Sequence, residues 1–110
     1  MAIELDQIRH DISDTDQQLL ALLAKRRALA LAVAEAKLAQ NKPIRDQKRE
    51  EELLLSLIGK GKDLGLDAQY VTRLYHVIIE DSVLQQQAKV QPRAYQIRRK
   101  RKVYRKKHLP

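Results

Sequence analysis

A chain of 110 residues has room for one domain, and the absence of cysteine excludes disulfide bonds and thiol chemistry. No apolar run approaches the roughly 20 residues that span a bilayer, and the N-terminus lacks the apolar stretch of a signal peptide, so we expect a cytoplasmic protein. The net charge of +8 comes from residues 91–110, which hold nine of the 22 Lys and Arg residues and no acid, whereas 13 basic and 14 acidic residues leave 1–90 nearly neutral.

The stretch from Leu5 to Gln40 contains neither glycine nor proline and is rich in alanine and leucine, which predicts one long helix. About 36 residues at ~1.5 Å each give roughly 54 Å, whereas a compact domain of 100 residues has a radius of gyration of about 13 Å. We therefore expect a second copy to share the helix. A stripe at coiled-coil spacing supports this: Ile8, Ile12, Thr15, Leu19, Leu22, Arg26, Leu29, Val33 and Ala36.

Arg26 interrupts this apolar stripe, and Lys37 lies within about 20° of the same face of the helix. Burying an unpaired guanidinium costs several kcal/mol, so a buried Arg26 needs a partner. Arg9 lies roughly 25 Å from Arg26 along the axis. One small pocket can therefore hold both arginines only if an antiparallel partner helix supplies Arg9. The alternative interpretation is that these are ordinary surface cations on a long helix.

A second helix is predicted to begin at Asp46. Asn41-Lys42-Pro43 ends the first helix, because proline cannot continue it. Asp46 is suited to cap the next one, and Glu50–Glu52 lie in its first turns, where the helix dipole favours anions. Its expected apolar face consists of Leu53, Leu54, Leu57 and Ile58.

Three glycines follow this apolar face, and we expect Gly59, Gly61 and Gly65 to mark the end of the second helix and a loop. The run Gly59–Lys62 faintly resembles a phosphate-binding loop. It lacks both the spacing and the preceding strand of a P-loop, so the sequence predicts a turn here.

A third helix is predicted after Asp67, another good N-cap. Its stripe turns polar at Ser82 and Gln86, where apolar residues are due. Either the helix leaves the core at this point and faces water, or the two polar residues serve a site. The stripe consists of Val71, Leu74, Tyr75, Ile78, Ser82 and Gln86.

Pro92 ends the regular pattern, and we divide the chain into a domain at 1–91 and a basic tail at 92–110. The tail has no apolar face to bury, so we expect it to be disordered. Its cations and the interleaved Tyr95 and Tyr104 leave open a contact with a nucleic acid backbone. That reading makes the chain a helical nucleic-acid-binding protein, and a coiled-coil module without chemistry is a further alternative.

The sequence predicts neither a metal site nor a covalent nucleophile. His10, His76 and His108 have no metal-binding spacing, and no nucleophile stands beside a base. An enzyme built from these residues would work by positioning and electrostatics.

Three segments in this order resemble the all-helical chorismate mutases, and in particular the N-terminal mutase domain of bifunctional chorismate mutase–prephenate dehydratases. They are 20–27 (LALLAKRR), 43–50 (PIRDQKRE) and 78–87 (IIEDSVLQQQ). The resemblance covers about residues 5–88. The resemblance does not extend to a dehydratase domain, and residues 92–110 resemble nothing in the family.

The resemblance implies an all-α fold of three helices with a very long first helix, in an intertwined homodimer with two shared active sites. It implies that chorismate, a dianion, is rearranged to prephenate in phenylalanine and tyrosine biosynthesis. The reaction is pericyclic and needs no cofactor and no metal.

The resemblance also implies roles for eight residues. Arg26 and Arg9 of the partner subunit would bind the substrate carboxylates. Lys37 and Gln86 would donate hydrogen bonds to the ether oxygen, and Glu50 would accept one from the ring hydroxyl. The residues expected to line the rest of the site are Asp46, Arg49 and Ser82. The residue types suit this chemistry, because arginine binds carboxylates through a bidentate fork and fixed donors stabilise the charge that grows on the ether oxygen.

Overall fold

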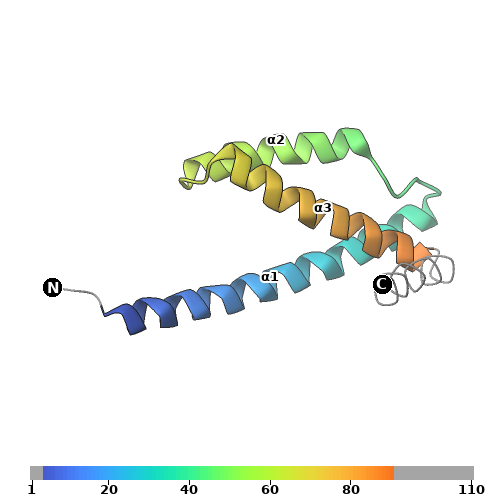
Figure 1. The fold of residues 1–110 in the computed structure, drawn as a ribbon. Helices are drawn as coiled ribbons and strands as arrows, with labels where there is room; N and C mark the ends of the chain where they lie inside the picture. The colour runs from blue at the N-terminus through green and yellow to red at the C-terminus, as the bar shows by residue number, and fades with distance from the viewer. Residues whose placement is uncertain (1–3, 91–110) are drawn as a thin grey trace, which may run out of the picture.

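The computed structural model describes residues 4–90 as three helices. They are α1 (Leu5–Ala39), α2 (Gln47–Asp63) and α3 (Ala68–Val90) (Figure 1). No strand occurs in these residues, so the predicted all-α fold with a very long first helix is confirmed. The predicted tail at 92–110 lies outside the described residues. None of the three helices combines the length and the apolar character needed to cross a bilayer.

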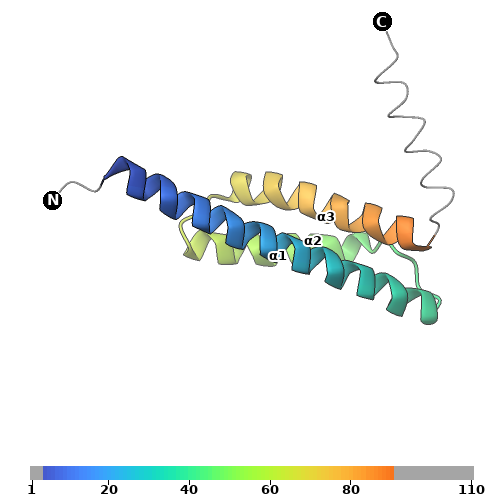
Figure 2. The same ribbon diagram turned by 90° about the horizontal axis from the view of Figure 1, so that it is seen from below.

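Successive helices run in opposite directions, and α3 packs against both α1 and α2 (Figures 1 and 2). In both views the N-terminal part of α1 extends beyond the other two helices. The Cα radius of gyration is 18.4 Å, well above the ~13 Å of a compact 100-residue domain. The chain by itself therefore leaves much of α1 uncovered, as the length of the helix predicts.

α2 and α3 begin at the N-cap residues that the sequence predicts. The Asp46 carboxylate accepts a hydrogen bond from the Arg49 backbone N–H at 3.1 Å, and Asp67 accepts one from the Tyr70 N–H, also at 3.1 Å. Each aspartate satisfies a backbone donor that has no partner inside its helix.

The ends of α1 and α2 share one geometry. Asn41 and Gly65 adopt positive φ angles of 59° and 83°. The next residue closes the helix in each case, because the N–H of Lys42 donates to the Lys37 carbonyl at 2.8 Å and the N–H of Leu66 to the Gly61 carbonyl at 2.8 Å. This is the Schellman arrangement, which favours glycine or asparagine at the left-handed position.

The prediction of a glycine-rich turn at Gly59–Lys62 is wrong, because α2 continues through these residues to Asp63. Gly61 is buried where α2 meets α3, and a Cβ atom there would lie 2.7 Å from Val71 Cγ2. The glycine serves close helix packing instead of breaking the helix. The helix ends at Asp63, and Gly65 takes the left-handed position that follows it.

Gly61→Ala is expected to lower the free energy of unfolding, because Val71 is buried and its branched side chain has little rotamer freedom in a helix. Overpacking costs about 1–3 kcal/mol, which outweighs the ~1 kcal/mol that alanine gains in helix propensity. Gly59→Ala is the matched control, since its Cβ would meet nothing within 4 Å. That variant should be stabilised. Chemical denaturation measures both, and a stabilised Gly61→Ala protein would contradict the packing argument.

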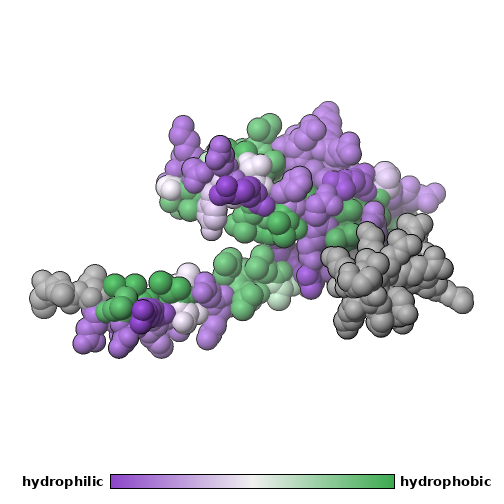
Figure 3. All heavy atoms as spheres, in the orientation of Figure 1, coloured by the Kyte–Doolittle hydropathy of each residue, from purple (hydrophilic) through white to green (hydrophobic). Residues whose placement is uncertain are grey.

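The buried apolar core of residues 4–90 is small and consists of Ala30, Ala34, Val71 and Val83. The apolar stripe of α1 is largely outside it: Leu22 is 62% exposed and Leu29 is 57% exposed. Figure 3 shows hydrophobic residues along α1 and on the facing side of α2 and α3, with open space between them toward the N-terminus. The stripe thus forms an apolar surface that one chain does not cover.

Candidate active site

Two cations of α1 flank a pair of buried alanines. Ala30 and Ala34 are the most buried residues of α1, and α3 is the helix that covers them. Arg26 lies one turn before this pair and Lys37 about one turn after it, and both are half-buried. α1 therefore presents one cation at each end of this buried pair.

Arg26 reaches across to α3. Its Nη1 donates to the Ser82 hydroxyl oxygen at 2.5 Å, and the Ser82 hydroxyl donates to the Ile78 carbonyl at 3.1 Å. Ser82 is a neutral partner, so it orients the guanidinium without neutralising its charge. A guanidinium has five N–H donors, and the others remain suited to an anion. Arg26 is therefore an oriented cation and not a plain surface residue.

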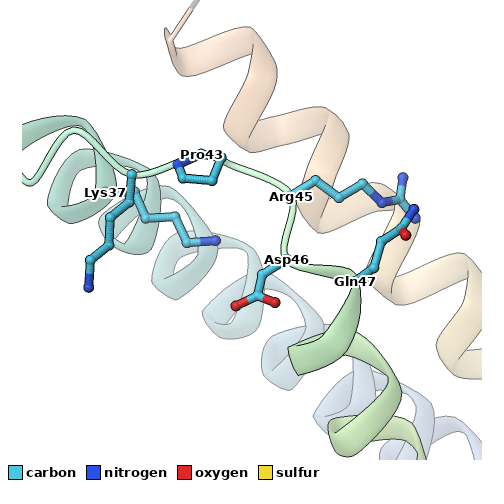
Figure 4. A pocket seen from close by; sticks show the side chains of 6 residues that line it. Lys37, Pro43, Arg45, Asp46 and Gln47 are labelled. Atoms are coloured by element: carbon cyan, nitrogen blue, oxygen red, sulfur yellow. The ribbon is translucent and has the colours of Figure 1, made fainter.

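Lys37 is held by the linker between α1 and α2. Its Nζ donates to the Ile44 carbonyl at 2.6 Å. The ammonium lies at a cavity of about 560 Å³ around this linker, shown in Figure 4. The cavity is lined by Lys37, Lys42, Pro43, Arg45, Asp46 and Gln47. Arg45 is paired with Glu50 and Glu80, but Lys37 and Lys42 still outnumber the acid Asp46, which makes the cavity suited to an anion.

Gln86 is buried in α3, one turn beyond Ser82, and only 8% of it is exposed. The interpretation that α3 turns to water at Ser82 and Gln86 is therefore wrong. Within residues 4–90 the Gln86 Oε1 atom is buried without a hydrogen-bond partner. An unpaired buried amide oxygen costs about 1–3 kcal/mol, which makes this end of Gln86 a candidate for a contact with a bound molecule.

Glu50 lies in the first turn of α2, where it is paired with the linker. Arg45 Nη2 lies 3.0 Å from Glu50 Oε1 and 2.7 Å from Glu80 Oε1 on α3. The hydrogen bond to Glu80 and the charge of Glu50 raise the pKa of Arg45 above its usual value. Arg45 therefore keeps its positive charge beside the two glutamates at ordinary pH.

The structure brings some of the predicted site residues together and leaves others apart. Arg26 contacts Ser82, and Lys37 and Asp46 share one cavity. Arg49 is exposed on α2. Arg9 is 68% exposed near the start of α1 and makes only a loose pair with Asp6 at 3.9 Å. Arg9 and Arg26 of one chain therefore lie apart, and this agrees with the separation predicted from helical geometry.

Sequence reasoning missed Arg45 and Glu80. It gave neither residue a role in the site. In the sequence, the position of Arg45 next to Asp46 and five residues before Glu50 is only a weak sign of an ion pair. The pairing of Arg45 with Glu80 depends on how α3 packs on α2. No cluster of His, Asp or Glu in the described part of the chain could hold a metal ion.

Comparison with known proteins identifies the family. The family described as chorismate mutase type II matches residues 8–87. The chain belongs to this family. Among type II relatives, the bifunctional chorismate mutase/prephenate dehydratase of Enterobacter agglomerans is 57% identical over 84 residues, which are 76% of this chain and 22% of that protein. The protein of the same name from Escherichia coli K12 is 56% identical over 84 residues, with the same shares.

A third relative is closer in length. The chorismate mutase of Methanocaldococcus jannaschii is 32% identical over 88 residues, which are 79% of this chain and 89% of that protein. The chain therefore spans about a fifth of the bifunctional relatives but most of a relative that bears only the mutase name.

Proposed function

We propose that this chain is a chorismate mutase, which converts chorismate into prephenate. The observation that carries the proposal is the match to the type II family over residues 8–87, which includes all eight site residues. The test is to follow chorismate loss and prephenate formation with the purified protein. A rate no higher than the spontaneous rearrangement would refute the proposal.

The two carboxylates of chorismate call for cations held apart from their own counterions. Arg26 meets this need, because a neutral hydroxyl orients it and no acid within residues 4–90 forms an ion pair with it. The fork of its guanidinium matches a carboxylate. We assign Arg26 to one carboxylate and Arg9 of the partner subunit to the other.

Acceleration requires groups that bind the transition state more tightly than the substrate. Negative charge grows on the ether oxygen as its bond to the ring breaks. We assign the donors for this oxygen to Lys37 and Gln86, and a fixed donor of this kind contributes about 10²–10³ in rate. Rotation of the Gln86 amide exchanges its oxygen and nitrogen, so the buried end of this side chain can present a donor.

The ring hydroxyl of chorismate needs an acceptor, and we assign this role to Glu50. A carboxylate accepts about four hydrogen bonds, and the recorded bond from Arg45 uses Oε1. Glu50 can therefore bind a hydroxyl while it is paired. Asp46, Arg49 and Ser82 complete the proposed site.

The active unit is proposed to be a homodimer with two shared sites. The exposed stripe of α1, including Leu19, Leu22, Leu29 and Val33, offers an apolar face to a second copy. Arg9 then enters the pocket of the other subunit, because an antiparallel helix brings it toward Arg26. We also propose that the enzyme acts in the cytoplasm, in phenylalanine and tyrosine biosynthesis.

Gln86→Glu is expected to make the reaction pH-dependent. Only a protonated carboxyl can donate to the ether oxygen, and an ordinary glutamate titrates near ~4.3, with burial moving the value upward. The variant should therefore be active in acid and lose about tenfold per pH unit above its pKa, while the parent stays nearly flat. Gln87→Glu, which places the same charge at an exposed neighbour, is the control and should stay flat. Parallel profiles for Gln86→Glu and the parent would contradict the assignment.

Truncation after Gln91 is expected to leave turnover and dimerisation within about twofold of the full chain. Residues 1–90 nearly balance their own charge and contain every proposed site residue. Steady-state kinetics and sedimentation check this expectation. A large loss of turnover would contradict this expectation, because it would show that the domain at 1–91 needs residues 92–110 for activity. Loss of nucleic acid binding with intact turnover would assign a separate role to it.

A further inference from the structure

Arg45 joins three elements of the chain around Glu50. It lies in the linker between α1 and α2, whereas Glu50 lies in the first turn of α2 and Glu80 on α3. A single guanidinium nitrogen, Nη2, bonds the Oε1 atoms of both glutamates, at 3.0 Å and 2.7 Å. The position of the Glu50 carboxylate therefore depends on a residue that the proposed reaction does not itself use.

The two glutamates need this cation. Because both oxygens bond the same nitrogen, the two carboxylates lie close together, and without Arg45 their like charges would repel each other. Glu50 is the less exposed partner, with 21% of its side chain accessible against 41% for Glu80. Nη2 carries two N–H groups, so one nitrogen of Arg45 can donate to both carboxylates at once.

Arg45 also lies at the boundary between two cavities. It lines the cavity of about 560 Å³ at Lys37, and it lines a second cavity of about 300 Å³ that contains Glu50 and Glu80. Figure 4 shows its side chain extending from the linker beside Asp46 and Gln47. It is therefore placed to set the geometry between the Lys37 end of the site and the Glu50 end.

We propose that Arg45 is a positioning residue, which holds Glu50 in the orientation that accepts the hydrogen bond from the ring hydroxyl of the substrate. The inference rests on the proposed function. It assigns no substrate contact to Arg45. Its effect on the rate passes through one hydrogen bond, so the effect depends on whether the substrate has that hydroxyl.

The test compares Arg45→Met with the parent on two substrates, chorismate and an analogue in which hydrogen replaces the ring hydroxyl. Misplacement of a group by about 1 Å can cost up to ~10²-fold in rate. We expect kcat/KM for chorismate to fall about 10- to 30-fold, on the same principle, and kcat/KM for the analogue to change by less than about threefold. An equal fall on both substrates would overturn the inference, because it would indicate a direct carboxylate contact or a general structural role. An unchanged rate on chorismate would overturn it as well.

Two further variants sharpen the test. In a Glu50→Gln background, Arg45→Met should cause little further loss on chorismate, whereas additive losses would contradict the inference. Arg27→Met is the matched control, because Arg27 bonds Asp81 through two nitrogens at 2.7 Å and 3.2 Å and ties α1 to α3 away from Glu50. It should affect the two substrates equally. A parent protein that does not rearrange chorismate would refute the proposed function itself, whereas an active parent with an equal Arg45→Met loss would refute only this inference.

Discussion

Lys37→Ala should lower kcat/KM for chorismate by about 10²–10³, because it removes a fixed donor from the oxygen on which charge develops. Lys37 is suited to this role, since the Ile44 carbonyl holds its ammonium at 2.6 Å and the side chain is half-buried beside the linker cavity. The loss should appear mainly in kcat, because the donor acts more strongly in the transition state than in the bound substrate.

The controls separate catalysis from folding. Lys25→Ala removes a cation from an exposed position of the same helix and should leave the kinetics unchanged. Circular dichroism should show unchanged helix content in the Lys37→Ala protein, because alanine is the better helix former. Lys37→Met keeps the apolar stem without the charge and should be as impaired as Lys37→Ala. Near-normal turnover in either Lys37 variant would refute the assignment of this lysine.

Mixed dimers should recover activity from two inactive parents. Arg9→Ala and Arg26→Ala are each expected to be nearly inactive as homodimers, because every pocket then lacks one of the two arginines that bind the substrate carboxylates. When the two variants are unfolded and refolded together in equal amounts, about half of the dimers should be mixed. In a mixed dimer one pocket lacks both arginines and the other has both. The mixture should therefore show about a quarter of the parent activity.

The chain offers a matched control for this experiment. Arg26 and Lys37 belong to the same helix and are proposed to serve one pocket from one subunit. A refolded mixture of Arg26→Ala and Lys37→Ala should then stay inactive, whereas Arg9→Ala with Lys37→Ala should recover as the first pair does. Mass spectrometry verifies that mixed dimers form. Mixed dimers of Arg9→Ala and Arg26→Ala without recovered activity would refute the shared site.

Much of the secondary structure follows from local chemistry. The absence of glycine and proline between Leu5 and Gln40 predicts α1 to within one residue of its observed end. Asp46 and Asp67 mark the helix starts, since each side chain bonds a backbone N–H three residues ahead. These features involve neighbours in the sequence, so no knowledge of the packing is needed. Several of the eight site residues stand out in the sequence pattern, but the roles of all eight rest on the resemblance to a family and stay predictions.

Packing between distant segments decided the rest. Local propensity alone predicts a break at Gly61, but the residue lies inside α2, and glycine is needed there because Val71 leaves no room for a Cβ atom. The polar residues at the end of the α3 stripe, Ser82 and Gln86, are buried in the region where α3 packs against other helices, and α1 supplies Arg26 as a partner for Ser82. The link from Arg45 to Glu80 spans 35 residues of sequence. A pattern of residue types cannot reveal such contacts, because they depend on the relative positions of helices that only the tertiary structure determines.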